Sequence, residues 1–155
     1  MQYLTAQIHK LLIKNRKTIA VAESCTGGLA AGLLTRLSGS SRYFILGVVA
    51  YSNEAKINIL HIPKAIIRRK SAISKEVALA LAQAVRKLGK TDFGIGITGI
   101  AGPTGATAQK SVGTVFIAVN SKNKNLCKKC LFKGDRLKIR KSAALKSLSL
   151  LKSLL

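Results

Sequence analysis

The sequence predicts an α/β fold in three layers, an α/β/α sandwich with helices on both faces of a mixed, mostly parallel sheet. In its first half, the 155-residue chain alternates short apolar runs with segments of helical periodicity, which is typical of parallel strands joined by helices. Residues 113–132 hold two strand-like runs around a polar turn, as in an antiparallel hairpin. The hydrophobic fraction of 48% fits a globular protein, so we expect a single domain over residues 1–155.

The elements of the first half follow from periodicity and turn residues. Apolar residues recur at helical spacing over 2–15, and the apolar run 18–22 is expected to form a buried strand. A polar, Gly-rich turn and a helix over 29–37 come next. After a second polar turn, the run 43–50 predicts another strand. Two short helices are expected to follow, one from Asn53 to about Leu60 and one opening at Pro63.

The second half begins with a long helix, capped by Ser74 and ending near Leu88. A strand is predicted over 93–98, followed by a long Gly-containing loop. The hairpin has its turn at 120–125. Asp135 is expected to cap a last helix that is rich in Leu and Lys.

The charge balance is strongly basic, with 27 Lys and Arg against 5 Asp and Glu, a net charge of +22. Such a surface attracts phosphates, nucleic acid or acidic membranes. The cations are spread along the whole chain, however, and no nucleic-acid motif accompanies them. We therefore expect solvated basic faces and no nucleic-acid partner. The longest near-apolar run, 43–51, is far shorter than the ~20 residues that span a bilayer, so no membrane segment is expected.

The chain has three cysteines: Cys25, Cys127 and Cys130. An odd number of cysteines, together with the lack of a secretory signal, predicts reduced thiols and a cytoplasmic location. The pair Cys127 and Cys130 has metal-ligand spacing, but a structural zinc site needs four ligands and no second such pair exists. We therefore expect no metal. The two histidines, His9 and His61, lie outside the Gly-rich turns and are interpreted as structural.

Three polar segments follow predicted strands, at residues 23–28, 51–56 and 98–105, and should meet at one edge of the sheet. Without a histidine in these turns, a Ser-Lys pair is the natural way to activate a hydroxyl, provided that burial lowers the pKa of the lysine. Lys56 is the candidate base, and Ser24, Ser40 and Ser41 are the candidate hydroxyls. Residue chemistry alone leaves open that Lys56 is a solvated surface residue and that the Gly-rich turn is a simple helix start.

Six motifs in register resemble the CinA C-terminal domain family over nearly the whole chain, from about residue 5 to 155. They lie at residues 22–28, 39–41, 47–56, 98–103, 112–115 and 134–136. The resemblance implies a nicotinamide-nucleotide amidase in stand-alone form, which converts nicotinamide mononucleotide and water to nicotinate mononucleotide and ammonia. It also implies a homo-oligomer, a dimer or larger, and no metal or organic cofactor.

By position, Ser24, Ser41, Tyr51 and Lys56 match the catalytic cluster of that family. The hypothesis is a serine nucleophile activated by neutral Lys56, with slight preference for Ser41 over Ser24. The resemblance also implies a set of substrate-binding groups. The backbone amides of Thr26, Gly27 and Gly28 would bind an oxyanion or phosphate. Gly102, in the loop after the third strand, would shape the pocket, and Arg136 would bind the substrate phosphate. Asp135 would cap its helix or orient Arg136.

The chain departs from the family pattern in two places. Residues 104–111 replace an acidic, Gly-rich stretch, and Lys75 stands where the family has Glu. Three alternatives therefore accompany the amidase hypothesis. One is an inactive binding module that kept the fold, another is a basic nucleic-acid-binding protein, and the third is an enzyme with Cys25 as nucleophile.

Overall fold

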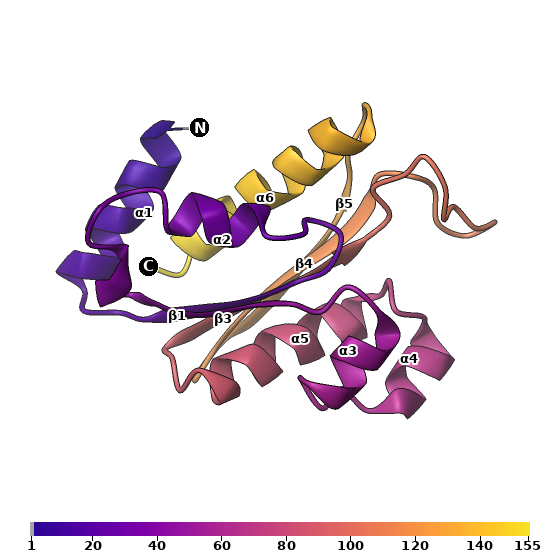
Figure 1. The fold of residues 1–155 in the computed structure, drawn as a ribbon, viewed down its shortest axis with the longest axis horizontal. Helices are drawn as coiled ribbons and strands as arrows, with labels where there is room; N and C mark the ends of the chain where they lie inside the picture. The colour runs from indigo at the N-terminus through magenta and orange to yellow at the C-terminus, as the bar shows by residue number, and fades with distance from the viewer. Residues whose placement is uncertain (1) are drawn as a thin grey trace.

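In the computed structural model, which describes residues 2–155, the strands form one sheet in the order β2-β1-β3-β4-β5 (Figure 1). β2 and β3 both pair parallel with β1, whereas β4 pairs antiparallel with β3 and β5, so only β4 runs against the others. The mixed sheet is therefore confirmed. Its strands are β1 (Ile19–Glu23), β2 (Phe44–Val49), β3 (Phe93–Gly99), β4 (Thr114–Ser121) and β5 (Asn125–Leu131).

Helices cover both faces of the sheet, which confirms the three-layer sandwich (Figure 1). One face carries α1 (Gln2–Lys14), α2 (Leu29–Leu34) and α6 (Arg136–Lys152); the other carries α3 (Asn53–Asn58), α4 (Lys64–Lys70) and α5 (Lys75–Leu88). α2 ends three residues earlier than the periodicity predicts. The Thr35 hydroxyl donates to the Ala31 carbonyl at this end of the helix. Turns and bends over 35–39 then lead to a single 3₁₀ turn, η1 (Ser40–Arg42).

Three helices begin at side-chain caps. Ser52, Ser74 and Asp135 each accept a hydrogen bond from an amide in the first turn of α3, α5 and α6. These bonds satisfy amides that have no partner within the helix itself. The predicted caps at Ser74 and Asp135 are confirmed.

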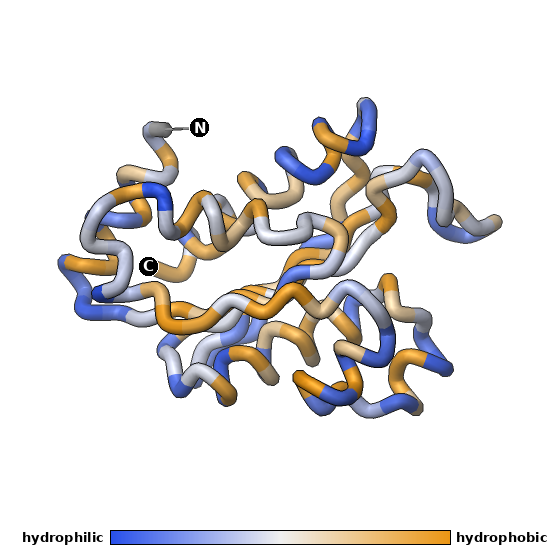
Figure 2. Tube along the Cα trace, viewed as in Figure 1, coloured by the Kyte–Doolittle hydropathy of each residue, from blue (hydrophilic) through white to orange (hydrophobic). Residues whose placement is uncertain are grey.

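The core is aliphatic and lies on both sides of the sheet; Figure 2 shows apolar segments along the sheet and on parts of the helices around it. α5 approaches β3 closely because β3 has no side chains at two positions. A Cβ added at Gly94 or Gly96 would lie 2.1 or 2.2 Å from a backbone oxygen of α5. The sequence of β3 thus fixes how near this helix lies.

Cys127 and Cys130 lie on β5 and contact different apolar clusters. Cys127 packs with the cluster beneath α5, and Cys130 packs with the large cluster on the α6 side. Residues three apart on a strand point to opposite faces, so the two thiols do not converge on one ligand. His9 packs edge-on against Tyr43, in keeping with a structural role. Within residues 2–155, every helix is too short or too polar to span a bilayer.

Candidate active site

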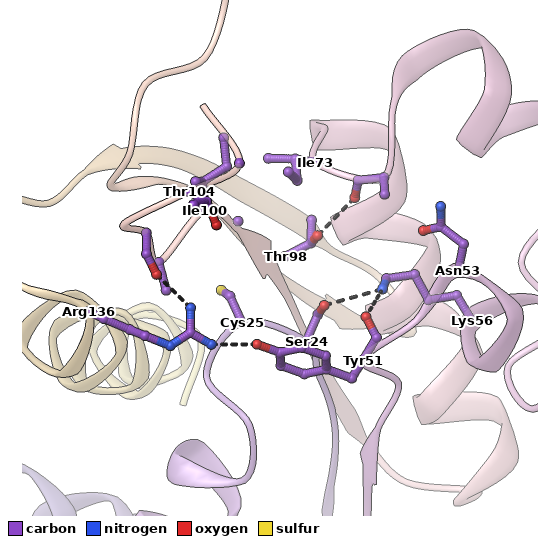
Figure 3. A pocket seen from close by; sticks show the side chains of 15 residues that line it. Ser24, Cys25, Tyr51, Asn53, Lys56, Ile73, Thr98, Ile100, Thr104 and Arg136 are labelled. Carbon is purple, nitrogen blue, oxygen red and sulfur yellow. Dashed lines mark hydrogen bonds between the residues drawn. The ribbon is translucent and has the colours of Figure 1, made fainter. Parts of the chain in front are cut away.

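A pocket of about 230 Å³ lies at the carboxyl ends of β1, β2 and β3. Its walls come from the turn after β1, the start of α3, the loop after β3 and the first residue of α6 (Figure 3). The three polar segments singled out by sequence therefore do meet at one edge. Because neighbouring parallel strands end on the same side, residues distant in the chain face one another here.

Ser24 is the first residue after β1, and the adjoining strand fixes its position. Its amide donates to the carbonyl of Ile97 in β3, and its own carbonyl accepts from the amide of Gly27. Only 9% of the residue is exposed, and it lines the pocket. A tight turn thus presents the Ser24 hydroxyl toward Lys56 (Figure 3).

Lys56 is buried on the short helix α3, with 2% of its surface exposed. Its ammonium nitrogen Nζ lies 3.2 Å from Ser24 Oγ and donates to the carbonyls of Ala50, Tyr51 and Ser52 at 2.9, 3.2 and 3.2 Å. Burial lowers the pKa of Lys56 from its ordinary value of 10.5, although nearby negative charge offsets part of the shift. The interpretation of Lys56 as a solvated surface residue is wrong.

Cys25 also lines the pocket but is unsuited to attack. Burial raises the pKa of its thiol to about 12, so the nucleophilic thiolate is scarce at neutral pH. The residue is 5% exposed and packs in the large core cluster. Cys25 is therefore a packing group beside the Ser24 hydroxyl.

The amides at the start of α2 donate hydrogen bonds to groups of the protein itself. This corrects the prediction that the amides of Gly27 and Gly28 bind a ligand. The buried carboxylate of Glu23 accepts from the amides of Gly28, Ala30 and Ala31 at 3.1, 3.1 and 2.8 Å. The Gly27 amide donates to Ser24 instead. Neither glycine, nor Thr26, lines the pocket. The amides of Gly27 and Gly28 are thus paired inside the protein, because the strand that precedes α2 supplies its own anion, the Glu23 carboxylate.

Arg140, which no sequence motif singled out, explains the shape of this turn. Its guanidinium donates twice to the Thr26 carbonyl, at 2.9 and 3.3 Å, from the second turn of α6. Gly27 has a φ of +59°, and a Cβ there would lie 2.9 Å from that guanidinium. Glycine is therefore needed at this position. No local pattern signals a contact between residues so far apart in the chain.

Arg136, Tyr51 and Gly102 form one hydrogen-bonded wall of the pocket (Figure 3). The Arg136 guanidinium donates to the Gly102 carbonyl at 2.7 Å and to the Tyr51 hydroxyl at 2.6 Å. Asp135 accepts from the Lys138 amide and caps α6, which fixes the first residue of that helix. Arg136, Tyr51 and Gly102 thus line the same pocket; Arg136 and Tyr51 are exposed, whereas Gly102 is buried.

Ser41 does not lie in the pocket, which corrects its predicted place in one cluster with Ser24, Tyr51 and Lys56. It is exposed in η1, which precedes β2, whereas Ser24 follows β1. The Tyr43 carbonyl accepts a hydrogen bond from the Ile19 amide at the start of β1. η1, which directly precedes Tyr43, therefore lies at the end of the sheet opposite to Ser24. β1 has five residues, which separates the two serines by roughly 17 Å. The hydroxyl beside Lys56 is that of Ser24.

Comparisons with known proteins agree with this architecture. The model of the CinA C-terminal domain matches residues 1–155. A protein from Thermoanaerobacter pseudethanolicus named for competence-damage induction is 49% identical over 92% of this chain, and a CinA-like protein from Syntrophus aciditrophicus is 45% identical over 96%. These alignments cover 35% and 36% of the relatives' own lengths, so the chain spans about a third of each.

Solved structures show the same fold. The competence/damage inducible protein CihA of Agrobacterium tumefaciens matches with a TM-score of 0.96 and 33% identity, covering 99% of this chain and 94% of the other. A CinA superfamily protein of Escherichia coli matches with a TM-score of 0.94 and 32% identity, covering 98% and 88%. From the motifs, the sheet order and these matches, this chain belongs to the CinA C-terminal domain family.

Proposed function

We propose that this chain hydrolyses the carboxamide of nicotinamide mononucleotide, with Ser24 as nucleophile and Lys56 as its base. The 3.2 Å contact between Lys56 Nζ and Ser24 Oγ carries the proposal. The resemblance to nicotinamide-nucleotide amidases supports the choice of substrate, and the geometry of the pocket supports the type of reaction. The three free cysteines fit a reducing compartment, so we place the reaction in the cytoplasm.

The hydrogen bonds around Lys56 suit a base that alternates between two protonation states. The ammonium has three protons for the carbonyls of Ala50, Tyr51 and Ser52. The neutral amine has two protons and a lone pair, which faces the Ser24 hydroxyl. Burial favours the neutral form, whereas the carbonyls stabilise the cation once a proton has been taken.

The reaction runs in two steps. Neutral Lys56 takes the hydroxyl proton as Ser24 Oγ attacks the carboxamide carbon. The backbone amide of Cys25, next to the nucleophile in the chain, is our candidate donor to the developing oxyanion. The C–N bond then breaks, and Lys56 returns the proton to the departing nitrogen, giving ammonia and a serine ester. In the second step Lys56 deprotonates a water that attacks the ester, and Ser24 recovers its proton as the acid product leaves.

The substrate phosphate has a candidate partner in Arg136. Two of its N–H groups hold Gly102 and Tyr51, and a guanidinium has five donors, so others stay available to an anion. The pocket is small, which suits the pyridine carboxamide, while the ribose phosphate extends past Tyr51 toward solvent. The net charge of +22 also draws an anionic substrate toward the surface.

The experiment measures ammonia and nicotinate mononucleotide produced from nicotinamide mononucleotide, with and without EDTA. We expect activity in wild type that survives EDTA and is lost in Ser24→Ala and Lys56→Arg. Arginine retains the charge but does not lose its proton near neutral pH, so it separates a base from a structural cation. Folding of each variant is checked by circular dichroism. A folded wild type that releases no ammonia overturns the proposal and supports the inactive binding module.

A further inference from the structure

A second pocket, of about 420 Å³, lies at the end of the sheet opposite to Ser24. It forms where β1 and β3 begin: Lys17 lies just before β1, and residues 91–93 lead into β3. The end of α5 and the turn between β4 and β5 complete its walls. β1 has five residues, so roughly 17 Å of strand separates this pocket from Ser24. A ligand bound here is therefore not the substrate of the Ser24–Lys56 pair.

Four cationic side chains from three separate segments line this second pocket. They are Lys17, Arg86, Lys90 and Lys122. Basic residues in the last turn of a helix complement the helix dipole, which accounts for Arg86 but not for Lys17 or Lys122. The cluster of cations therefore exceeds what the end of α5 requires.

One carboxylate, that of Asp92, lines the pocket with these cations and is already hydrogen-bonded. It accepts from the Thr18 amide at 2.9 Å, from the Thr18 hydroxyl at 3.1 Å and from Lys17 Nζ at 3.0 Å. Lys17 and Asp92 thus pair with each other, whereas the other three cations belong to no ion pair within residues 2–155. Four cations against one carboxylate leave an excess of three positive charges in the pocket.

The guanidinium of Arg86 is held in place by the sheet beneath it. Arg86 is half-buried, and its Nε donates to the side-chain oxygen of Asn120, a buried residue of β4. Gly94 of β3, which pairs with Asn120, permits this contact because a Cβ at Gly94 would lie 2.7 Å from the Cβ of Arg86. The one hydrogen bond that Arg86 makes within residues 2–155 uses Nε, so both Nη groups remain for a ligand. A guanidinium fixed in this way matches the oxygens of a phosphate.

We propose that this second pocket binds a diphosphate group, either as the free anion or as part of a nucleotide. A single phosphate monoester carries a charge of about −1.5 to −2 at pH 7, so two linked phosphates match the excess of three positive charges more closely. Arg86 binds one phosphate with its fixed guanidinium, and the exposed, flexible side chains of Lys90 and Lys122 bind the other as point charges. This binding does not depend on the amidase activity proposed above.

Isothermal titration calorimetry at about 0.15 M salt, with no divalent cation present, tests the site. We expect wild type to bind one inorganic diphosphate per chain, and to bind orthophosphate about tenfold or more weakly because a single phosphate contacts fewer of the cations. ADP and AMP identify the source of the group. ADP that binds at least as tightly as inorganic diphosphate indicates a nucleotide, and weaker binding of ADP indicates the free anion. Wild type that binds neither, or that binds AMP as tightly as ADP, overturns the proposal.

Two double variants of equal net charge separate the pocket from the general basic surface. Lys90→Gln/Lys122→Gln removes two cations of the pocket, and Lys128→Gln/Lys129→Gln removes two exposed cations of β5 that lie outside it. We expect the first variant to weaken diphosphate binding about tenfold or more, and the second to change it by less than about twofold. Equal losses in the two variants would show that the net charge of +22, rather than the pocket, attracts the anion, and would overturn the proposal.

Two further variants locate the bound anion. Arg86→Lys keeps the charge but loses the planar guanidinium, so diphosphate binding should weaken although the net charge is unchanged. Arg136→Gln alters the pocket beside Ser24 and should bind diphosphate as wild type does. Circular dichroism checks that each variant is folded. Loss of binding in Arg136→Gln alone, or a short DNA duplex that binds wild type more tightly than diphosphate does, overturns the proposal.

Discussion

Lys56 Nζ lies 3.2 Å from Ser24 Oγ although the two residues are 32 positions apart in the sequence. β1 and β2 are adjacent and parallel, so the turn after β1 and the helix after β2 begin at the same edge of the sheet. The lysine is buried, and three backbone carbonyls surround its amine. This pair sets the chemistry that the protein is expected to perform.

The rate of the reaction should rise with pH. Lys56 acts as the free amine, and burial holds its pKa below 10.5, so the active fraction grows as pH increases through that lowered pKa. We expect kcat/KM for nicotinamide mononucleotide to rise with pH and to level off before pH 10.5. A pH profile measured at constant ionic strength checks this. A rate that falls over the same range would contradict a lysine base.

Cys25→Ala should keep most of the activity. The thiol has a pKa of about 12 and lies beside the nucleophile as a packing group, so its removal leaves the Ser24–Lys56 pair in place. The raised pKa also stabilises the folded state below pH 9, the ordinary thiol value, and that contribution is lost as pH rises from 9 toward 12. Turnover and urea unfolding as a function of pH measure both effects. A loss of activity comparable to that of Ser24→Ala would identify Cys25 as the nucleophile.

Arg136→Ala should weaken binding of the phosphorylated substrate specifically. The guanidinium supplies charge-assisted donors at the mouth of the pocket, and such bonds contribute about 1.5–3 kcal/mol each. KM for nicotinamide mononucleotide should rise about tenfold or more, while turnover of nicotinamide riboside, which lacks the phosphate, changes little. Steady-state kinetics with both substrates is the measurement. Equal losses for the two substrates would show that Arg136 mainly orders the wall that it forms with Tyr51 and Gly102.

Glu23→Gln should destabilise the protein. The buried carboxylate accepts three amide hydrogen bonds at the start of α2, and an amide side chain places an N–H group against some of those donors. We expect a loss of about 1–3 kcal/mol in the free energy of unfolding, measured in urea. Glu76→Gln removes an exposed carboxylate beside Lys70 and should change stability by less than about 0.5 kcal/mol. Equal effects of the two variants would contradict the role given to Glu23.

Gly96→Ala should be among the most damaging single-methyl additions to the fold. The new Cβ would lie 2.2 Å from the Ala78 carbonyl oxygen, so α5 would have to move away from β3. We expect a loss of about 3 kcal/mol or more in unfolding free energy, near the upper end for overpacking. Gly32→Ala in α2 meets no atom within 4 Å and should stabilise by about 0.5–1 kcal/mol, since alanine favours helix. Thermal unfolding of both variants, compared with wild type, decides the matter.

Local signals in the sequence predicted the elements well. Caps such as Ser74 and Asp135 act on amides only three residues away, so their effect is visible in a short window of sequence. The alternation of apolar runs and helices likewise predicted the three layers. The length of α2 was overestimated because the helix ends at Leu34 and the chain continues through turns and bends over 35–39, although the apolar spacing runs on to Leu37.

The candidate site was predicted less completely. The motifs placed Ser24, Tyr51, Lys56, Gly102 and Arg136 correctly at one pocket, because parallel strands end on the same side. Ser41 was expected there too, but the full length of β1 separates it from Ser24. The amides of Gly27 and Gly28 were expected to face a ligand, yet they donate to Ser24 and Glu23. Motifs indicate that a set of residues serves one site, but they do not show at which end of a strand each residue lies.

The sequence by itself determined the order of helices and strands, the caps, the family and the set of polar residues available for chemistry. Tertiary structure alone decided which serine lies beside Lys56 and how Glu23 and Arg140 hold the turn after β1. The physical reason is the distance along the chain over which each interaction acts. Caps and periodicity act over a few residues of chain, whereas the burial of Lys56 and the pairing of strands depend on segments that meet only when the sheet has formed.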